Sequence, residues 1–254
     1  MISKSLSKYI QSLHQKKYRQ EHGAFLVEGA IDVLELCASD YQMELLLVTE
    51  PFYKENAGLL DKQRVRLEMV SADDLKRVGT LVVNEAALAV AKTKENRFLV
   101  ADADEFVLVL DDIRDPGNLG TILRIADWYG IRKLICSQST ADVYNPKVIS
   151  ASKGSFARVE WYYCDLNTYL KAVSEPVFGA FLDGENVHSL DFGKSGYLVM
   201  GNEANGISFE VEKLVSKRIT IPRYGLAESL NVGIATAVIC DNLRRGETAR
   251  VGAK

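Results

Sequence analysis

The fold is decided by residues 106–124, which have the sequence FVLVLDDIRDPGNLGTILR. The run from Phe106 to Leu110 is continuously apolar and rich in β-formers, which is typical of a strand buried on both faces of a parallel sheet. An Asp-Pro-Gly turn follows, and then apolar residues recur at helical spacing through Tyr129. A strand, a loop and a helix in this order predict an α/β fold, whose ligands bind beyond the carboxyl ends of the strands.

The same alternation of strand and helix patterns extends over the whole chain. A larger unit over 104–254 has predicted strands at 106–110, 133–136, 158–161, 177–182, 197–200 and 218–221. A smaller unit over 1–103 has predicted helices at 4–18, 30–38 and 72–77, and predicted strands at 24–27, 44–49, 66–70, 86–91 and 97–101. The polar run ADADE at 101–105 breaks the pattern, so we place the domain boundary between residues 103 and 104.

The composition, 47% apolar and 26% charged over 254 residues, is that of an ordinary globular protein. The sequence holds no apolar run of the ~20 residues that a membrane helix needs, and the start MISKSLSKYIQ lacks the apolar core of an export signal. We therefore expect a cytoplasmic protein with no membrane partner. The four cysteines form no C-x-x-C pair, which favours buried free thiols over a zinc site or disulfides.

The net charge of -3 leaves nucleic-acid binding to local patches. One basic run lies within residues 1–22, where Glu21 is the single acidic residue. Its basic members are Lys4, Lys8, Lys16, Lys17 and Arg19. Contact with phosphate groups and a solvated helix face explain such a run equally well.

Three strand-end loops carry unusual polar residues. In the first, Asn118 is suited to cap the helix that follows, and Arg124 lies off the buried stripe of that helix. In the second, residues 198–206 (LVMGNEANG), two glycines flank Glu203, which allows close backbone approach to a ligand. A solvated arginine, a capping asparagine and a plain turn explain these residues when each loop is taken alone.

The third loop lies within residues 219–239, ITIPRYGLAESLNVGIATAVI. Pro222 ends the strand, and Ser229 is suited to start a helix that is apolar nearly all round, as a buried helix is. Asn231 then lies at the mouth of this helix without an equally ordinary structural role. Helix N-termini favour anions, which suits a phosphate at this position.

Together the three segments resemble the signature motifs of the SpoU (TrmH-like) family of RNA 2′-O-ribose methyltransferases, within the SPOUT superfamily. The resemblance holds in order, spacing and residue type over about residues 104–247. The segment 17–29, KYRQEHGAFLVEG, looks like the substrate-binding domain similar to ribosomal protein L30e that many members carry.

The resemblance implies a parallel α/β sheet with a C-terminal trefoil knot, a homodimer, and S-adenosylmethionine as cofactor without a metal. Matched position by position, the cofactor-binding residues are Gly201, Ile221, Leu230, Leu182 and Gly184. The matched catalytic residues are Asn118, Arg124, Glu203, Ser229 and Asn231. Arg124 is expected to orient the ribose hydroxyl and its neighbouring phosphate, with Glu203 pairing with Arg124.

RNA is the implied partner, and rRNA is favoured over tRNA because relatives with the L30e-like extension often modify rRNA. The alternatives are a tRNA 2′-O-methyltransferase and a non-catalytic RNA-binding assembly protein that keeps the fold. The full set of matched catalytic residues argues against the latter. A nucleotide-dependent oxidoreductase would need a glycine fingerprint after the first strand, and this sequence lacks it.

Overall fold

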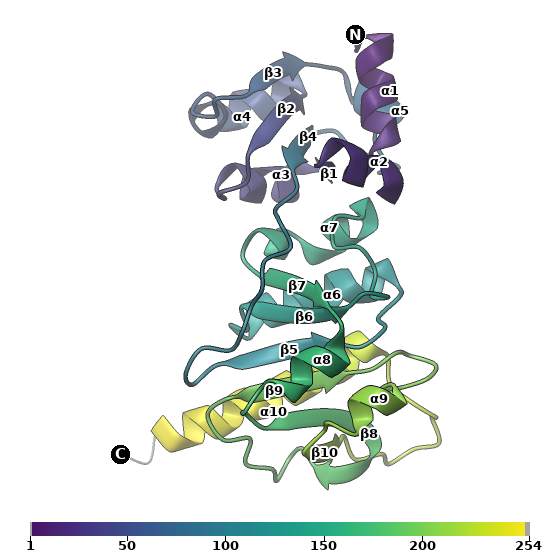
Figure 1. Ribbon diagram of the computed structural model, residues 1–254. Coiled ribbons are helices and arrows are strands. Elements are labelled where there is room, and N and C mark those ends of the chain that lie inside the picture. Colours follow the sequence, from purple (N-terminus) through teal and green to yellow (C-terminus); the bar gives the residue numbers. More distant parts are fainter. Residues whose placement is uncertain (1, 252–254) are drawn as a thin grey trace. The chain divides into compact units, whose positions relative to one another are not determined.

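The computed structural model describes the backbone of residues 2–251 and the side chains of residues 2–245. The chain forms two compact units. The N-terminal unit comprises the residues up to Glu95 together with 142–158, and the C-terminal unit comprises 96–141 together with the residues from Val159 onward (Figure 1). The chain therefore passes between the two units three times.

The N-terminal unit is built on a four-stranded mixed sheet of order β1-β4-β2-β3, in which only β2 and β3 run parallel. Its strands are β1 (Ala24–Glu28), β2 (Met43–Val48), β3 (Arg66–Met69) and β4 (Ala87–Lys92). Its helices are α1 (Lys4–Ser12), α2 (Lys16–His22), α3 (Ala30–Cys37), α4 (Glu50–Leu60) and α5 (Ala72–Val78). Helices α1 and α5 cover one face of the sheet, and α3 and α4 cover the other (Figure 1).

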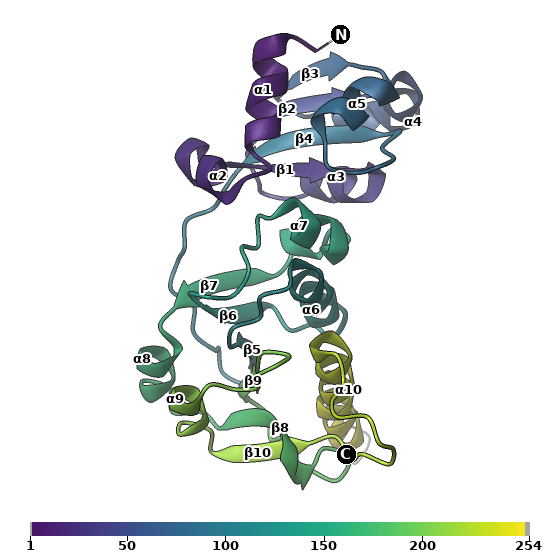
Figure 2. The ribbon, with the colours of Figure 1, turned by 90° about the vertical axis from the view of Figure 1, so that its right-hand side faces the viewer.

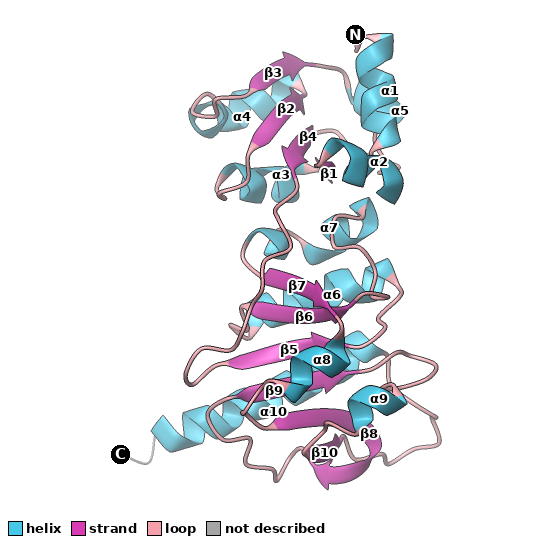
Figure 3. Ribbon diagram, in the orientation of Figure 1, coloured by secondary structure: helices cyan, strands magenta, loops and turns pink. Residues whose placement is uncertain are grey.

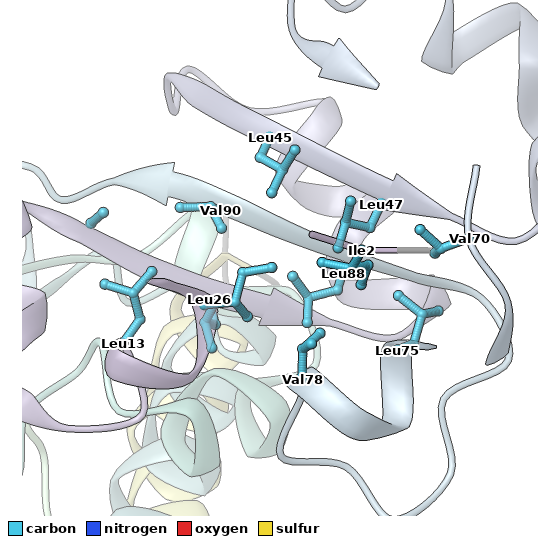
Figure 4. Close-up of a cluster of buried hydrophobic side chains, with 12 residues drawn as sticks. Ile2, Leu13, Leu26, Leu45, Leu47, Val70, Leu75, Val78, Leu88 and Val90 are labelled. Atoms are coloured by element: carbon cyan, nitrogen blue, oxygen red, sulfur yellow. The ribbon is translucent and has the colours of Figure 1, made fainter. Parts of the chain in front are cut away.

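Alternate residues of the strands form the core under α1 and α5. Leu26, Leu47 and Leu88 point from the sheet toward Leu75 and Val78 of α5 (Figure 4). All five side chains are at most 1% exposed, and full burial of each contributes roughly 1.5–3 kcal/mol. The strand period of two thus fixes which face of the sheet each helix covers.

The segment 142–158 completes the aromatic core of the N-terminal unit. It contains α7 (Pro146–Ser152) and a 3-10 turn, η1 (Ser155–Ala157). Phe25 of β1 lies 4.6 Å from Tyr144 and 6.2 Å from Phe156, measured between ring centroids. The segment leaves and rejoins the C-terminal unit, yet its apolar side chains belong to the other core.

A buried ion pair holds the start of this segment. Arg19 is 3% exposed, and its Nη2 donates to Asp142 Oδ2 at 2.6 Å. Its Nη1 donates to the carbonyls of Leu13 and His14, which lie where α1 ends. Arg19 is therefore committed to internal contacts and leaves the predicted basic run as four exposed lysines. The same arginine explains why the predicted helix 4–18 is two helices, because it binds the backbone carbonyls of Leu13 and His14 between α1 and α2.

The C-terminal unit is built on a six-stranded, fully parallel sheet of order β10-β8-β9-β5-β6-β7. The strands are β5 (Phe106–Leu110), β6 (Lys133–Ser137), β7 (Glu160–Cys164), β8 (Val177–Asn186), β9 (Gly196–Met200) and β10 (Lys217–Thr220). Four helices flank them: α6 (Pro116–Trp128), α8 (Leu166–Lys171), α9 (Phe209–Glu212) and α10 (Val232–Val251). The predicted α/β class and parallel sheet are confirmed.

The helices lie on both faces of this sheet, with α6 and α10 on one side and α8 and α9 on the other (Figure 2). All five residues of β5 are buried, as its continuous apolar sequence predicted. Helices α6 and α10 run in the same direction. A Cβ on Gly233 of α10 would lie 3.1 Å from Thr121 Cγ2, and further along Arg244 Nε donates to the carbonyl of Tyr129 at 2.6 Å.

Several element boundaries differ from the sequence prediction (Figure 3). The predicted strand 97–101 is a loop. Just before it, the side chain of Asn96 exchanges two 2.8 Å hydrogen bonds with the backbone of Tyr163 on edge strand β7. The predicted strand 158–161 begins at Glu160, because the turn η1 occupies the preceding residues. Helix α4 was not predicted, although Pro51 in its first turn is typical of a helix start.

All four cysteines are buried and free, as predicted. Burial raises the pKa of Cys37 and of Cys164 to about 11, so both thiols stay protonated near neutral pH. None of the helices within residues 2–251 is both long and apolar enough to cross a membrane. The C-terminal trefoil knot stays a prediction.

Candidate active site

The site lies where the strand order of the parallel sheet reverses. Strand β5 leads to β6 and β7 on one side, whereas β9, β8 and β10 lie on the other. Strands β5 and β9 are neighbours, with Leu110 opposite Met200 at their carboxyl ends. The loops that follow them therefore leave the sheet side by side, at the switch point where α/β folds bind ligands.

Hydrogen bonds tie these two loops together. Asn202 Nδ2 donates to the carbonyl of Asp112 at 2.8 Å, and the amide of Ser208 donates to Asp111 Oδ2 at 2.7 Å. Asn202 also closes its own loop, since its backbone exchanges hydrogen bonds of 2.9 and 2.8 Å with that of Gly206. These contacts fix the position of Glu203 within the turn.

Asp115, not Asn118, caps helix α6. Asp115 Oδ1 accepts a 2.9 Å hydrogen bond from the amide of Asn118, which corrects the predicted capping role of the asparagine. The aspartate of the Asp-Pro-Gly turn precedes Pro116, and proline is favoured in the first helical turn. The Asn118 side chain is thereby left for other partners, and its Nδ2 donates to Glu203 Oε1.

Asn231 caps helix α10 and also reaches Asn118. Its Oδ1 accepts from the amides of Gly233 at 2.9 Å and Ile234 at 3.3 Å, so Asn231 rather than Ser229 is the capping residue. Its Nδ2 donates to Asn118 Oδ1 at 2.9 Å. A directed hydrogen-bond chain thus runs from the N-terminus of α10 through Asn231 and Asn118 to Glu203. This chain joins all three predicted loops.

Arg124 and Ser229 stand apart from that chain. Arg124 is exposed on α6, off the stripe formed by Leu119, Ile122 and Leu123, as the helical spacing predicted. In the described structure Glu203 Oε1 accepts from Asn118 Nδ2 rather than from Arg124, and the Glu203–Arg124 pair stays a prediction. Ser229 is exposed two residues before Asn231.

The predicted cofactor residues follow the strands of the same sheet edge. Gly201 follows β9, Ile221 follows β10, and Leu182 and Gly184 belong to the end of β8. A Cβ on Gly201 would lie 2.3 Å from the Gly206 carbonyl carbon. A Cβ on Gly184 would lie 2.6 Å from the Arg218 carbonyl oxygen. Both glycines are therefore required by close approach of the chain's own backbone.

The segment from Ile221 to Leu230 suits a nucleoside cofactor that carries an amino-acid tail. Within it, no backbone amide donates to a backbone carbonyl of the described chain. Leu230 is 49% exposed, and Leu182 is 77% exposed. Backbone amides without a backbone acceptor, near accessible apolar side chains, are what a purine ring and a charged tail need, so the residues fit S-adenosylmethionine.

Sequence reasoning missed the residues that support the site: Asp111, Asp112, Asp115 and Asn202. Burial raises the pKa of Asp112, but hydrogen bonds from Arg114 and Ser139 and the charge of Arg114 outweigh it and hold that pKa below its usual value. These residues share one signal, because each lies within five positions after β5 or β9. Among the described side chains, no group of three or more His, Cys, Asp and Glu could hold a metal.

Comparison with known proteins identifies both parts of the chain. The sequence model of the SpoU rRNA Methylase family matches residues 105–241, and that of the MRM3-like substrate binding domain matches residues 5–97. The 23S rRNA (guanosine(2553)-2'-O)-methyltransferase RlmP of Bacillus subtilis is 30% identical over 239 residues. That alignment covers 92% of this chain and 94% of RlmP.

Solved structures of similar proteins lead to the same family. A putative RNA methyltransferase of the TrmH family from Porphyromonas gingivalis has a TM-score of 0.84 at 36% identity, over 96% of this chain and 99% of that one. An AdoMet-bound rRNA methyltransferase from Sinorhizobium meliloti has a TM-score of 0.81 at 26% identity, over 96% and 97%. With a family match over more than half its length and a relative along most of it, the chain belongs to the SpoU rRNA methylase family.

Proposed function

We propose that this protein transfers the methyl group of S-adenosylmethionine to a ribose 2′-hydroxyl of rRNA, at the site around Asn118, Glu203 and Asn231. The observation that carries the proposal is the hydrogen-bond chain that brings the three loops into one site at the switch point of the sheet. S-adenosylmethionine supplies a methyl group made electrophilic by its positive sulfur, so the reaction needs no metal.

The chain's own residues have to align a weak nucleophile. A ribose hydroxyl reacts only when its oxygen faces the methyl group and its proton can leave. Arg124 orients this hydroxyl and binds the neighbouring phosphate, because a guanidinium offers several donors in a planar fork. Glu203 is held by Asn118, which Asn231 holds in turn. Asn231 and Ser229, two residues before it, shape the ribose and cofactor contacts.

We assign the substrate class as rRNA because RlmP, which aligns along both units of this chain, is named as a 23S rRNA methyltransferase. We propose the division of labour that the sequence predicts, in which residues 1–103 belong to a substrate-binding part similar to L30e and residues 104–254 to a catalytic part; segment 142–158 of the latter packs in the N-terminal unit. We also propose that the protein acts in the cytoplasm, as the sequence predicts.

We also propose a homodimer formed through the C-terminal unit, with the knot at its interface. Large apolar side chains support it. Trp128 on α6 is 82% exposed, Ile234 on α10 is 57% exposed, and Tyr224 and Leu226 before α10 are 93% and 101% exposed. Exposed apolar side chains of this size are typical of protein interfaces.

The test is methyl transfer by the purified full chain to unmodified 23S rRNA and to tRNA, read by mapping 2′-O-methyl sites. Arg124→Ala should lower kcat/KM on rRNA by roughly 10²- to 10³-fold, as loss of a positioned charged donor does. Binding of S-adenosylhomocysteine, measured by calorimetry, should not change. Arg132→Ala is the matched control, since Arg132 is an exposed arginine just before β6, at the amino ends of the strands and thus opposite the site.

Equal labelling by Arg124→Ala and the wild type would remove Arg124 from the mechanism. A wild-type protein that binds rRNA but neither methylates RNA nor binds S-adenosylhomocysteine would establish the non-catalytic alternative. Methylation of tRNA and not of rRNA would show that tRNA is the substrate.

A further inference from the structure

A loop of the N-terminal unit is held rigidly by a buried carboxylate. Glu28 ends β1 and is 5% exposed. Its oxygens accept hydrogen bonds from the amide of Thr80 at 3.0 Å and from Thr80 Oγ1 at 2.6 Å. A Cβ on Gly79 would lie 2.2 Å from Glu28 Oε2 and 2.9 Å from the Leu75 carbonyl oxygen, so a larger residue would displace the carboxylate. Glu28 thereby anchors one end of the loop 79–84, and Asn84, whose Nδ2 donates to the carbonyl of Ala87 at 2.9 Å, anchors the other end.

This fixed loop presents apolar side chains to solvent. Val82 is 80% exposed and Val83 is 71% exposed. Leu81 lies over Gly29 at the start of α3, where Ile31 is also 57% exposed. Holding neighbouring apolar side chains in water gains nothing for folding, and such patches mark contact surfaces.

A hollow of about 550 Å³ adjoins the loop. Thr80 and Leu81 line it from the loop side, while Asn145, Lys147 and Lys153 line it from the segment 142–158. His14, at the break between α1 and α2, completes the wall. None of the described residues that line the hollow carries a carboxylate, although the protein as a whole has a net charge of -3.

We propose that the hollow and the Val82–Val83 loop together bind a single-stranded segment of the RNA substrate, a proposal that rests on the proposed function. Lys147 and Lys153 contact phosphates in the hollow, while Val82 and Val83 pack against exposed bases. Single strands offer RNA-binding proteins this combination of backbone charge and unstacked apolar base faces. The two lysines favour an anionic partner over a neutral protein surface, and among anionic partners RNA is the one that the proposed function supplies.

Part of this surface comes from the inserted segment. Lys147 and Lys153 belong to α7 and its C-terminal end, which pack in the N-terminal unit although they connect β6 to β7. The Arg19–Asp142 pair fixes the start of that segment. The RNA-binding surface therefore includes residues outside the range matched by the substrate-binding family.

The test is filter binding of the full chain to an unmodified 23S rRNA transcript across a range of salt concentrations. Lys147→Gln should weaken binding about threefold to tenfold near 0.1 M salt and reduce the slope of log K against log salt by about 0.7, the value for one phosphate of a single strand. The double variant Val82→Ser/Val83→Ser should weaken binding by about threefold with the slope unchanged, since it removes apolar contact alone.

Two matched controls belong to the same unit but do not line the hollow. Lys62→Gln replaces an exposed lysine, and Met69→Ser replaces an apolar side chain that is 47% exposed. Both should bind the transcript like the wild type. In methyl transfer, Lys147→Gln and the double variant should raise the KM for RNA and leave kcat unchanged. Thermal unfolding like that of the wild type excludes misfolding.

The outcomes separate this proposal from the proposed function. If the wild type methylates rRNA and both hollow variants bind the transcript like the wild type, the surface assignment is wrong while the function stands. Variants that bind RNA normally but no longer retain a ribosomal protein would make the surface a protein-docking site and overturn the proposal. Absence of methylation by the wild type would instead count against the function.

Discussion

The side-chain amide of Asn118 forms hydrogen bonds through both its nitrogen and its oxygen. Its nitrogen donates to Glu203 Oε1, and its oxygen accepts from Asn231 Nδ2 at 2.9 Å. The amide orientation is therefore set from both sides, and aspartate, which has the same shape, cannot replace it. A carboxylate at this position would face Glu203 as a like charge.

We expect Asn118→Asp to lower kcat for methyl transfer by about 10²-fold, because it removes a donor and adds repulsion at a charged partner. Single-turnover transfer to rRNA measures this effect, with S-adenosylhomocysteine affinity and thermal unfolding as controls. Wild-type turnover by Asn118→Asp would show that the asparagine-to-glutamate hydrogen bond plays no part in the reaction.

Asp32, on α3 of the N-terminal unit, lowers the stability of the folded protein in a pH-dependent way. It is 3% exposed, and its Oδ1 has no hydrogen-bond partner. Burial raises its pKa from 3.8 to about 6, against the lowering effects of Lys153 and the Gly154 amide. A carboxyl whose pKa is higher in the folded state binds its proton more tightly there, so stability falls as pH rises from about 4 to about 6.

Asp32→Asn should therefore raise the free energy of unfolding by about 1–2 kcal/mol at pH 7.5 and change it little at pH 4. Urea unfolding at the two pH values measures the difference. Glu55→Gln, at an exposed position of α4, should show no such dependence. A loss of stability in Asp32→Asn at both pH values would mean that the buried charge has a stabilising partner.

At the scale of elements, strands were predicted better than helix starts. The buried run of β5 and the parallel sheet follow from apolar sequence, because a strand covered on both faces leaves no polar positions. The capping residues were misassigned. Asp115, Asn118, Ser229 and Asn231 are all good caps by residue type, and tertiary contacts decide which of them caps a helix.

The candidate site, too, could be predicted from the sequence only in part, because tertiary contacts arrange its residues. Sequence motifs identified Asn118, Glu203 and Asn231, but their order in one hydrogen-bond chain depends on strands that are distant in sequence and paired in space. No sequence pattern indicated that segment 142–158 packs in the N-terminal unit. That packing rests on Phe25, Tyr144 and Phe156, whose apolar character fits either core.

The two roles of Asn231 can be separated at helix α10. Asn231→Asp keeps an oxygen for the helix amides and places a negative charge at the helix N-terminus, but it no longer donates to Asn118. We expect near-wild-type thermal unfolding with at least about tenfold lower kcat. Asn231→Ala should lose both functions and about 1 kcal/mol of stability. Equal stability losses in the two variants would show that Asn231 does not cap α10.

At the scale of the whole molecule, the N-terminal unit depends on residues far along the chain. Without segment 142–158, the rings of Phe25 and Tyr41 would lose their contacts with Tyr144 and Phe156 and face water. Arg19 would also keep a buried charge without its carboxylate, which is costly.

A chain ending at residue 103 should therefore fold poorly, although the predicted domain boundary lies there. We expect it to bind a hydrophobic dye and to unfold at least about 10 °C below the full chain, since several kcal/mol of contacts are lost. Far-UV circular dichroism during heating measures this. Cooperative unfolding of the short chain near the temperature of the full chain would establish residues 1–103 as an independent domain.

The three crossings between the units also constrain the order of events during synthesis. The first 95 residues leave the ribosome with half of an aromatic core, and the other half follows only after β5 and β6 have been made. In many proteins the N-terminal domain finishes folding before the next domain is translated, but the N-terminal unit of this protein cannot do so. Nascent chains stalled before residue 142 should hold an open, chaperone-accessible N-terminal unit, and chains long enough for residue 158 to have left the exit tunnel should hold a protease-resistant one.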